Sequence, residues 1–309
     1  MADAALQATV RAPPARKGGG LAQLLHRSEK LRGYLLLSPT MLIMAVGILA
    51  PVVILAIMSF WTRDGFDFIT EMILTNYQDA AEKPIYGAFL LRSFQMSGLA
   101  TIATVLLCYP MAYYVAFHVH RYKMLWIILM TLPFWTSYLL RVFAWKVILG
   151  YEGVINSALI SVGVIGEPLE FLLYSQTAVI ITLAHAWAAF AILPLYVSLE
   201  KIDRSLLEAA TDLGDGPVRR FLRVTLPLSL PGVIAATFLI FIPTTGDFIT
   251  PALLGGPDGQ MIGSLIQLQF GAVNNWPMGA TLSIILMVWI ALTALVFLLI
   301  TRTVSARAA

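Results

Sequence analysis

The sequence has few charged side chains and almost no cysteine. Asp, Glu, Lys and Arg together make up 12% of the 309 residues, whereas 59% are hydrophobic. Soluble globular proteins carry about 25% charged residues, so this composition indicates an integral membrane protein. The one cysteine, Cys108, lies in an apolar run, which excludes an intramolecular disulfide and is typical of a small packed hydrophobic side chain. The net charge of +3 does not indicate a nucleic-acid partner, because the placement of basic residues matters more in a membrane protein than their sum.

The motifs of nucleotide binding and hydrolysis are also missing. The sequence contains no G-x-x-x-x-G-K-[ST] loop, so the chain is not expected to bind ATP in the usual way. No cysteine or carboxylate set stands at metal-ligand spacing from His118, His120 or His185. Neither a nucleophile elbow nor a carboxylate pair placed for hydrolysis is present. We therefore expect no catalytic residues, no metal site and a non-enzymatic role.

Six apolar runs approach or exceed the length that crosses about 30 Å of hydrocarbon as a helix. Barrel strands of alternating polarity are absent, and lipid requires backbone groups to be satisfied internally. The sequence therefore predicts an all-α integral membrane protein with six transmembrane helices. The third run is the shortest and stops before Arg141. The predicted spans are residues 36–60, 94–117, 124–140, 178–199, 232–254 and 279–301.

The basic residues predict the orientation. Residues 1–33 are rich in Ala, Gly, Pro and basic residues, so we expect a disordered tail followed by a transmembrane domain over residues 34–309. The first apolar run exceeds a signal-peptide core and is expected to remain as an anchor. Basic residues gather in the tail, after the second span, at residues 201–223 and near the C-terminus. The positive-inside rule then places both termini and the 200–228 loop in the cytoplasm.

The connections predicted to lie outside are acidic. A solvated loop is the ordinary explanation of such charge, and contact with an external delivery protein is the functional one. The acidic residues are Asp64, Asp67, Glu71, Asp79, Glu82, Glu152, Glu167 and Glu170.

The 200–228 loop predicts two short helices with a break between them. Ser205 and Glu208 have the spacing of a capping box, and the positions Leu206, Ala210 and Leu213 form an apolar stripe. Gly214 is expected to stop the first helix, and Pro217 is expected to open the second.

A longer pattern in this loop runs from Glu208-Ala209-Ala210, across three residues to Gly214, and on to Leu226-Pro227. This pattern resembles the cytoplasmic signature of permeases of binding-protein-dependent ABC importers. Val224 stands where that family more often has Ile. The resemblance implies a type I importer permease in a bacterial inner membrane, with this loop as the coupling helix. Glu208 would orient that helix or pair with an ATPase cation, Ala209 and Ala210 would permit close approach, and Gly214 would permit the turn. The coupling residues are Glu208, Ala209, Ala210, Asp212, Gly214, Leu226 and Pro227.

The same resemblance implies the partners. Two ATPase subunits would bind ATP and magnesium, a second homologous permease subunit would complete the passage, and a periplasmic solute-binding protein would deliver cargo. A secondary transporter that works without an ATPase is the distant alternative, and it leaves the loop signature unexplained.

Asp247 is the most informative residue for cargo. It lies in the fifth predicted span among Pro and Gly residues that expose backbone groups. A carboxylate inside a membrane costs about 2.5–3.5 kcal/mol even on lenient scales, so it should face water, the bundle interior or a cation. One explanation of this carboxylate is structural, an ion pair with Arg141 or Lys146. A point on the path of a cationic substrate is the functional one, for which Tyr138, Trp145 and Phe248 are candidate neighbours through cation–π attraction.

A second resemblance concerns the cargo. The stretches 138–145, 153–156, 246–256 and 275–279 are similar to the polyamine (spermidine/putrescine) branch of these permeases. Asp247 stands where that branch often has Glu. The resemblance implies a polyamine cargo, and related branches that carry opines or amino-acid derivatives remain the alternative.

Overall fold

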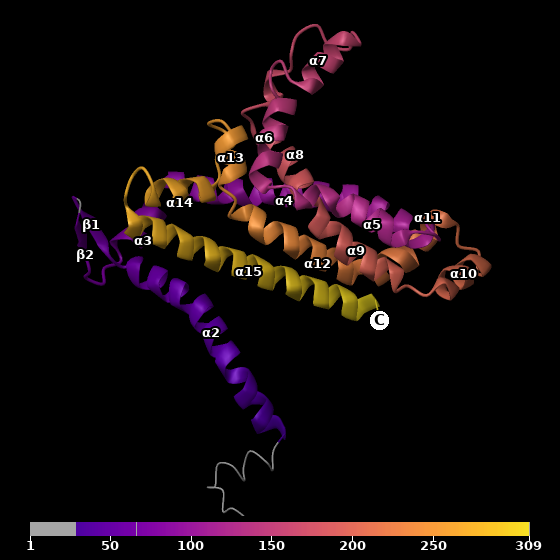
Figure 1. Ribbon diagram of the computed structural model, residues 1–309, viewed down its shortest axis with the longest axis horizontal. Helices are drawn as coiled ribbons and strands as arrows, with labels where there is room; N and C mark the ends of the chain where they lie inside the picture. Colours follow the sequence, from indigo (N-terminus) through magenta and orange to yellow (C-terminus); the bar gives the residue numbers. More distant parts are fainter. Residues whose placement is uncertain (1–28, 66, 309) are drawn as a thin grey trace, which may run out of the picture. The chain divides into compact units, whose positions relative to one another are not determined.

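The computed structural model describes residues 29–65 and 67–308 of the chain, and these are mostly helical (Figure 1). The tail predicted over residues 1–33 lies outside the described residues up to residue 28. The chain divides between Ile54 and Leu55 into two compact units. In the first unit the described residues belong to one helix, α2 (Glu29–Met58), which contains Pro39 and Pro51 and continues into the second unit.

The second unit holds all the other described elements. In chain order they are β1 (Thr62–Asp64), β2 (Asp67–Ile69), α3 (Thr75–Glu82), α4 (Pro84–Phe117), α5 (Lys123–Thr131), η1 (Leu132–Trp135), α6 (Tyr138–Ile148), α7 (Val154–Ser161), η2 (Glu170–Leu172), α8 (Gln176–Ala186), α9 (Ala188–Glu200), α10 (Arg204–Asp212), α11 (Pro217–Arg220), η3 (Phe221–Thr225), α12 (Leu226–Thr245), α13 (Ile249–Leu254), α14 (Ile262–Phe270) and α15 (Trp276–Ala308).

A bundle of α4, α5, α9 and α12 forms the body of this unit (Figure 1). Its core combines small and branched residues, among them Ala112, Ala191, Leu195 and Ile240, all buried. In lipid the hydrophobic effect does not drive helices together, so their association depends on close packing. Small residues allow this because they let the helix backbones approach closely. At Gly232 of α12 the approach to α9 is so close that any side chain would overlap Ser198.

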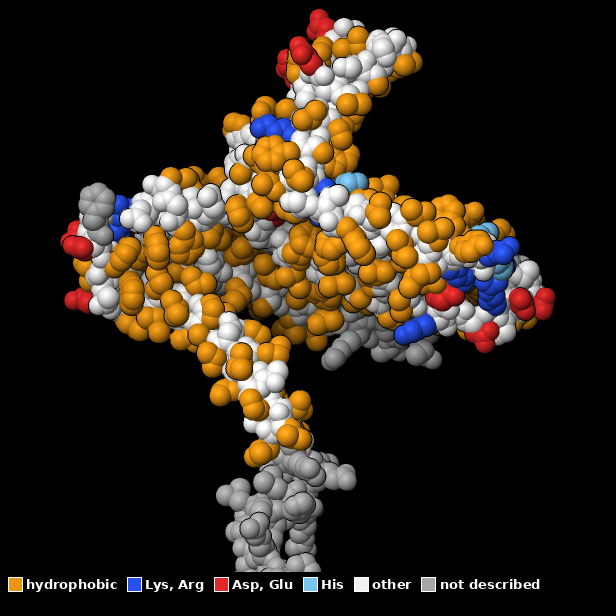
Figure 2. All heavy atoms as spheres, in the orientation of Figure 1, with side chains coloured by type: hydrophobic (Ala, Val, Ile, Leu, Met, Phe, Trp, Pro, Cys, Tyr) orange, Lys and Arg blue, Asp and Glu red, His pale blue; other side chains and the backbone are white. Residues whose placement is uncertain are grey.

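Four described helices are long and apolar enough to cross a membrane, and their surface is mostly hydrophobic (Figure 2). Two further crossings are bent pairs, Lys123–Trp135 with Tyr138–Ile148 at 85° and Gln176–Ala186 with Ala188–Glu200 at 49°. Counting each pair as one span gives the predicted six. The four unbroken spans are Gly33–Met58, Pro84–Phe117, Pro217–Thr245 and Trp276–Thr301.

Four predicted spans have the wrong limits. The span predicted over residues 94–117 begins earlier, at Pro84. The span predicted over residues 124–140 is broken at η1, where Pro133 has no N–H to donate and the chain turns before α6. The span predicted over residues 178–199 is broken at Trp187. The span predicted over residues 232–254 is helical from Pro217 and ends at Thr245, because Gly246 caps it.

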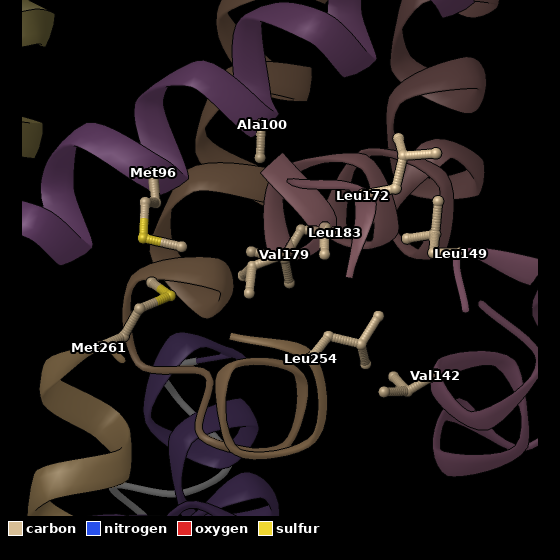
Figure 3. Close-up of a cluster of buried hydrophobic side chains, with 10 residues drawn as sticks. Met96, Ala100, Val142, Leu149, Leu172, Val179, Leu183, Leu254 and Met261 are labelled. Carbon is tan, nitrogen blue, oxygen red and sulfur yellow. The ribbon is translucent and has the colours of Figure 1, made fainter. Parts of the chain in front are cut away.

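Beyond these breaks, α6, α7 and α8 project from the bundle as an arm (Figure 1). A hydrophobic cluster joins the arm to α4 and α13, and Figure 3 shows its side chains directed toward one another. Met96 comes from α4, Val142 from α6, Val179 from α8 and Leu254 from α13. The cluster therefore fixes α6 and α13 beside each other.

At the end of the bundle opposite α10, a hairpin of β1 and β2 pairs Thr62 with Ile69. Arg63 donates a hydrogen bond to the carbonyl oxygen of Val273, and α14 packs on α15 through Ile262, Met278 and Leu282. The acidic loop that was predicted to lie outside thus contains a paired hairpin that is bonded to the segment after α14.

Candidate coupling loop and buried carboxylate

The coupling loop begins with a capped helix, but the cap differs from the prediction. Asp203 is the N-cap of α10, and its Oδ1 accepts a hydrogen bond from the Ser205 N–H at 3.0 Å. The predicted capping box of Ser205 and Glu208 is wrong, because α10 begins at Arg204. This hydrogen bond holds the pKa of the Asp203 carboxyl below its ordinary value.

Replacing Asp203 by Ala is expected to fray the first turn of α10 and to lower cargo uptake per ATP hydrolysed. Asp203→Asn should preserve both, because Asn is as good an N-cap as Asp. Since the folded-state pKa is lowered, the stabilisation by Asp203 is complete above the ordinary carboxyl pKa and is lost as the pH falls through the lowered pKa. Uptake and ATPase assays near pH 7 would measure the ratio, and equal ratios for the Ala and Asn variants would contradict this role.

α10 ends next to Gly214, the glycine that was predicted to stop it. Gly214 has φ +89°, a conformation that side chains rarely adopt. The N–H of Gly214 bonds to Thr211 O at 2.9 Å, and the N–H of Asp215 bonds to Ala210 O at 3.0 Å. The last carbonyls of α10 are thereby satisfied.

The apolar stripe predicted for α10 is only partly right. Ala210 is buried, whereas Leu206 is 47% and Leu213 88% exposed. The stripe therefore divides into one buried residue and an exposed apolar edge. Val218 and Leu222, also exposed, belong to the segment just after the turn. These four exposed residues, Leu206, Leu213, Val218 and Leu222, form what we term the apolar edge of the loop.

Glu208 and Asp212 face a polar cavity of about 470 Å³ between α10 and the end of α4. They are one helical turn apart and thus on one face. No hydrogen bond or ion pair of either carboxylate is present among the described residues. Arg220 crosses from α11 to bond Thr211 Oγ1 at 2.9 Å, and this contact closes the loop on itself. Figure 2 shows charged side chains gathered at this end of the bundle.

The second predicted short helix is the start of the fifth span. Pro217 opens α11 as predicted, but η3 and α12 continue it without a break. η3 is a π-helical turn in which the N–H of Leu226 reaches back to Phe221 O. Pro227, which lacks an N–H, follows at once. Leu226 and Pro227 therefore follow directly on a π-turn inside the fifth span, and such turns often mark functional sites.

Phe221 anchors this junction to α4. Its ring packs edge-on against Tyr109 at 5.8 Å and against Tyr113 at 6.2 Å between centroids. Tyr109 also shares a 2.7 Å hydrogen bond with Ser229 of α12. The candidate coupling loop is thus connected by direct contacts to α4 and α12.

Asp247 lies between the end of α12 and the start of α13, and it is 9% exposed. Its Oδ1 accepts a hydrogen bond from the Ile249 N–H at 3.0 Å. Its Oδ2 accepts one from the Tyr138 hydroxyl at 2.5 Å. The same hydroxyl is 2.6 Å from Thr250 Oγ1. Asp247 and Tyr138 are thus in direct contact.

The ion pair considered for Asp247 is not formed within the described part of the chain. Arg141 instead donates from Nη1 to Ala186 O at 2.9 Å. Lys146 lies 5.6 Å from the ring centroid of Tyr174. The described residues therefore surround Asp247 with neutral donors.

The other two candidate path residues lie apart from the carboxylate. Trp145 donates from Nε1 to His185 Nδ1 at 3.1 Å, and it lies two helical turns along α6 from Tyr138 on the same face. Phe248, 43% exposed, lines a pocket of about 720 Å³ between α12, α14 and α15. The structure therefore separates Trp145 and Phe248 from the contact between Asp247 and Tyr138.

Three neighbours of this site are absent from the sequence prediction. Thr250 shares the Tyr138 hydroxyl, and Trp187 packs 6.2 Å from the Tyr138 ring with its Nε1 buried and unbonded. Gly263 of α14 lies against the backbone of Asp247. The sequence around Gly263 is that of an ordinary apolar helix, so its contact with Asp247 can be recognised only from the fold.

Gly263→Ala is expected to displace the Gly246–Asp247 peptide and to lower thermal stability. A Cβ there would lie 2.5 Å from Asp247 O and 2.6 Å from Gly246 O, and such overpacking costs about 1–3 kcal/mol. Gly98→Ala in α4, which meets open space, is the matched control. Thermal unfolding in detergent would show a lower midpoint for Gly263→Ala alone, and equal midpoints would refute the close approach.

Comparison with known proteins places the chain in a family. Residues 19–307 match the binding-protein-dependent transport system inner membrane components. The spermidine/putrescine transport system permease protein PotB of Haemophilus influenzae is 40% identical over 250 residues, which cover 81% of this chain and 87% of PotB. PotB of Escherichia coli is 39% identical over 241 residues, which cover 77% and 86%.

The fold is that of solved importer permeases. A chain of a bacterial alginate ABC transporter, solved with an alginate-loaded periplasmic protein, superposes with a TM-score of 0.70 at 17% identity and covers 92% of this chain and 98% of that one. The resemblances drawn from the loop and from the stretches around Asp247 are both confirmed. This chain belongs to the family of binding-protein-dependent transport system inner membrane components.

Proposed function

We propose that this chain is a non-catalytic permease subunit of an ATP-driven importer whose cargo is a polyamine such as putrescine or spermidine. The printed names of the PotB relatives support the cargo. The observation that carries the proposal is the Asp247 carboxylate, which is 9% exposed and bonded only to neutral donors. A buried carboxylate that has no cationic partner in the protein would be stabilised by a cation that arrives with the cargo.

Tyr138 closes over Asp247 in this proposal. An ammonium group would take the place of the Tyr138 hydroxyl at Oδ2, while Oδ1 stays bonded to the Ile249 N–H. The Thr250 hydroxyl would then receive the displaced Tyr138 hydroxyl. The cargo thus replaces a hydrogen bond from a neutral hydroxyl by one from a cationic ammonium group, so that donor and acceptor carry opposite charges.

The coupling loop is the proposed ATPase contact. The apolar edge offers hydrophobic area to a partner, because exposed apolar residues beside charged ones are typical of interaction sites. Glu208 and Asp212 offer carboxylates to cations of the ATPase. Ala209 and Ala210 allow close approach, and Gly214 sets the turn.

The assembly follows from this contact. Two ATPase subunits would dock on the cytoplasmic side and bind ATP and magnesium, a second homologous permease would complete the passage, and a periplasmic binding protein would dock opposite. Both termini would lie in the cytoplasm. Inverting a 1:99 population of two states requires about 5.5 kcal/mol, which nucleotide bound between the ATPases would supply.

ATP hydrolysis by the assembled complex tests the cargo class. The binding protein loaded with putrescine or spermidine is expected to stimulate hydrolysis, whereas the same protein offered an opine or an amino-acid derivative is not. Stimulation only by the opine or amino-acid derivative would refute the polyamine cargo and keep the importer. Hydrolysis unaffected by any loaded binding protein would refute both.

A further inference from the structure

A pocket of about 670 Å³ lies on the side of the bundle where α5 turns into α6 and α8 turns into α9. Apart from Cys108, whose side chain is buried, its walls along α4, α5 and α9 are apolar. From Ala103 to Met111 of α4 the apolar wall runs about 12 Å at 1.5 Å per residue. The wall residues are Ala103, Leu107, Cys108, Met111, Trp126, Leu129, Met130, Ala188, Ala189 and Ile192.

The end of the pocket at the two bends is cationic. Arg141 lines it, and only its Nη1 has a protein acceptor, the Ala186 carbonyl. Its Nε is buried without a partner. The guanidinium lies 5.3 Å from the Phe134 ring centroid and 5.8 Å from that of Tyr138. Arginine has five N–H donors, so most remain without an acceptor among the described residues.

His185 adds a second donor at the same end. The Trp145 indole can only donate, so its 3.1 Å bond to His185 Nδ1 requires that nitrogen to be the acceptor. The neutral imidazole then carries its proton on Nε2, which has no bonded partner within the described part of the chain. His185 is exposed and lines the pocket beside Arg141. Figure 2 shows blue and pale-blue atoms within an orange surface at the foot of the arm.

The position along the span is compatible with a lipid headgroup. The segment Lys123–Trp135 rises about 20 Å at 1.5 Å per residue, whereas the hydrocarbon core is about 30 Å thick. The bends therefore lie about 10 Å from the opposite border, a distance over which arginine side chains and headgroups approach each other. Charged groups that face hydrocarbon without a partner are rare because they are costly.

We propose that this pocket binds an anionic phospholipid, with one acyl chain along α4 and α5 and the phosphodiester bonded to Arg141 and His185. A carboxylate from a partner subunit would satisfy the cationic end but would leave the apolar wall uncovered. No described carboxylate forms an ion pair with Arg141, so the site has an excess positive charge that favours a net-anionic lipid over a zwitterionic one. The proposal requires only that the chain spans a membrane.

Photolabelling of the assembled complex tests the site. The complex is placed in phosphatidylcholine nanodiscs that contain a little phosphatidylglycerol with a diazirine in its acyl chain, and labelled peptides are mapped by mass spectrometry. Label is expected on the peptides that carry Leu107 and Leu129. Arg141→Gln should lower that label at least about tenfold, since it removes a charge-assisted contact.

Arg92→Gln is the matched control. Like Arg141, Arg92 donates to one backbone carbonyl, that of Pro257 at 3.3 Å, and it lies over an aromatic ring, that of Phe89. Unlabelled phosphatidylglycerol should displace the label from the unmodified complex, and phosphatidylcholine should not. This competition does not depend on any variant folding. Equal labelling of Arg141→Gln, equal competition by both lipids, or label in the isolated chain but not in the complex would each overturn the proposal, the last by showing that a partner subunit covers the pocket.

Discussion

Asp247→Asn is expected to lower ATP-dependent uptake of putrescine and spermidine at least about tenfold at saturating loaded binding protein. The substitution keeps the shape, and Asn still accepts from the Ile249 N–H and still meets the Tyr138 hydroxyl. It removes only the charge, and a hydrogen bond to a charged group contributes about 1.5–3 kcal/mol, which corresponds to about 10–100-fold. Uptake by proteoliposomes, normalised to ATP hydrolysis, measures the loss.

Two variants separate the charge from its surroundings. Tyr138→Phe keeps the carboxylate and removes the group that competes with the cargo at Oδ2, so most of the uptake should remain. Asp258→Asn removes an exposed acidic side chain after α13 and should leave uptake unchanged. Full uptake by Asp247→Asn, or a loss as large in Tyr138→Phe as in Asp247→Asn, would exclude the charge as the determinant.

Gly214→Val is expected to reduce uptake per ATP hydrolysed by about fivefold or more. At φ +89° a valine is strained by roughly 1–2 kcal/mol, and a free energy of that size changes a conformational population about 5–30-fold. The turn that presents Leu213 beside the end of α10 would open. Copurification of the ATPase subunits and the ratio of uptake to hydrolysis report this change.

Gly216→Val is the control because Gly216 has an ordinary backbone conformation in the same loop. Gly216, two residues along the same loop, also meets open space but has φ −68° and ψ 168°, which valine adopts readily. Full coupling is expected for this variant. Equal coupling by the two variants would show that the left-handed turn at Gly214 is not required.

The coupling loop was largely predictable because its signals are local. Gly214 stops α10 and Pro217 opens α11 through the backbone preferences of those residues themselves. The cap was misassigned because Asp203 and Ser205 are both good N-caps and only the geometry separates them. The exposure of Leu213 could not be predicted for a related reason. Periodicity shows which residues share a helix face, but not whether another part of the protein covers that face.

The bends of the spans were not predictable from hydropathy. The runs containing Pro133 and Trp187 are mostly apolar on both sides of the bend, so a hydropathy window finds one span where the backbone forms two helices. The hydrogen bond between Tyr138 and Asp247 joins residues 109 apart in the chain. Its formation depends on the packing of α6 against α13, and no local sequence pattern indicates that packing. For the same reason the role of Gly263 emerges only from the fold.

The central claim is that ATP drives a polyamine through this chain after delivery by a binding protein. The most direct test is uptake of labelled putrescine and spermidine into proteoliposomes that hold the chain with its partner permease and ATPases, with and without ATP and loaded binding protein. The account predicts uptake only when both are present. Uptake without ATP would contradict the importer, and an assembled complex that hydrolyses ATP but takes up neither compound would contradict the polyamine cargo.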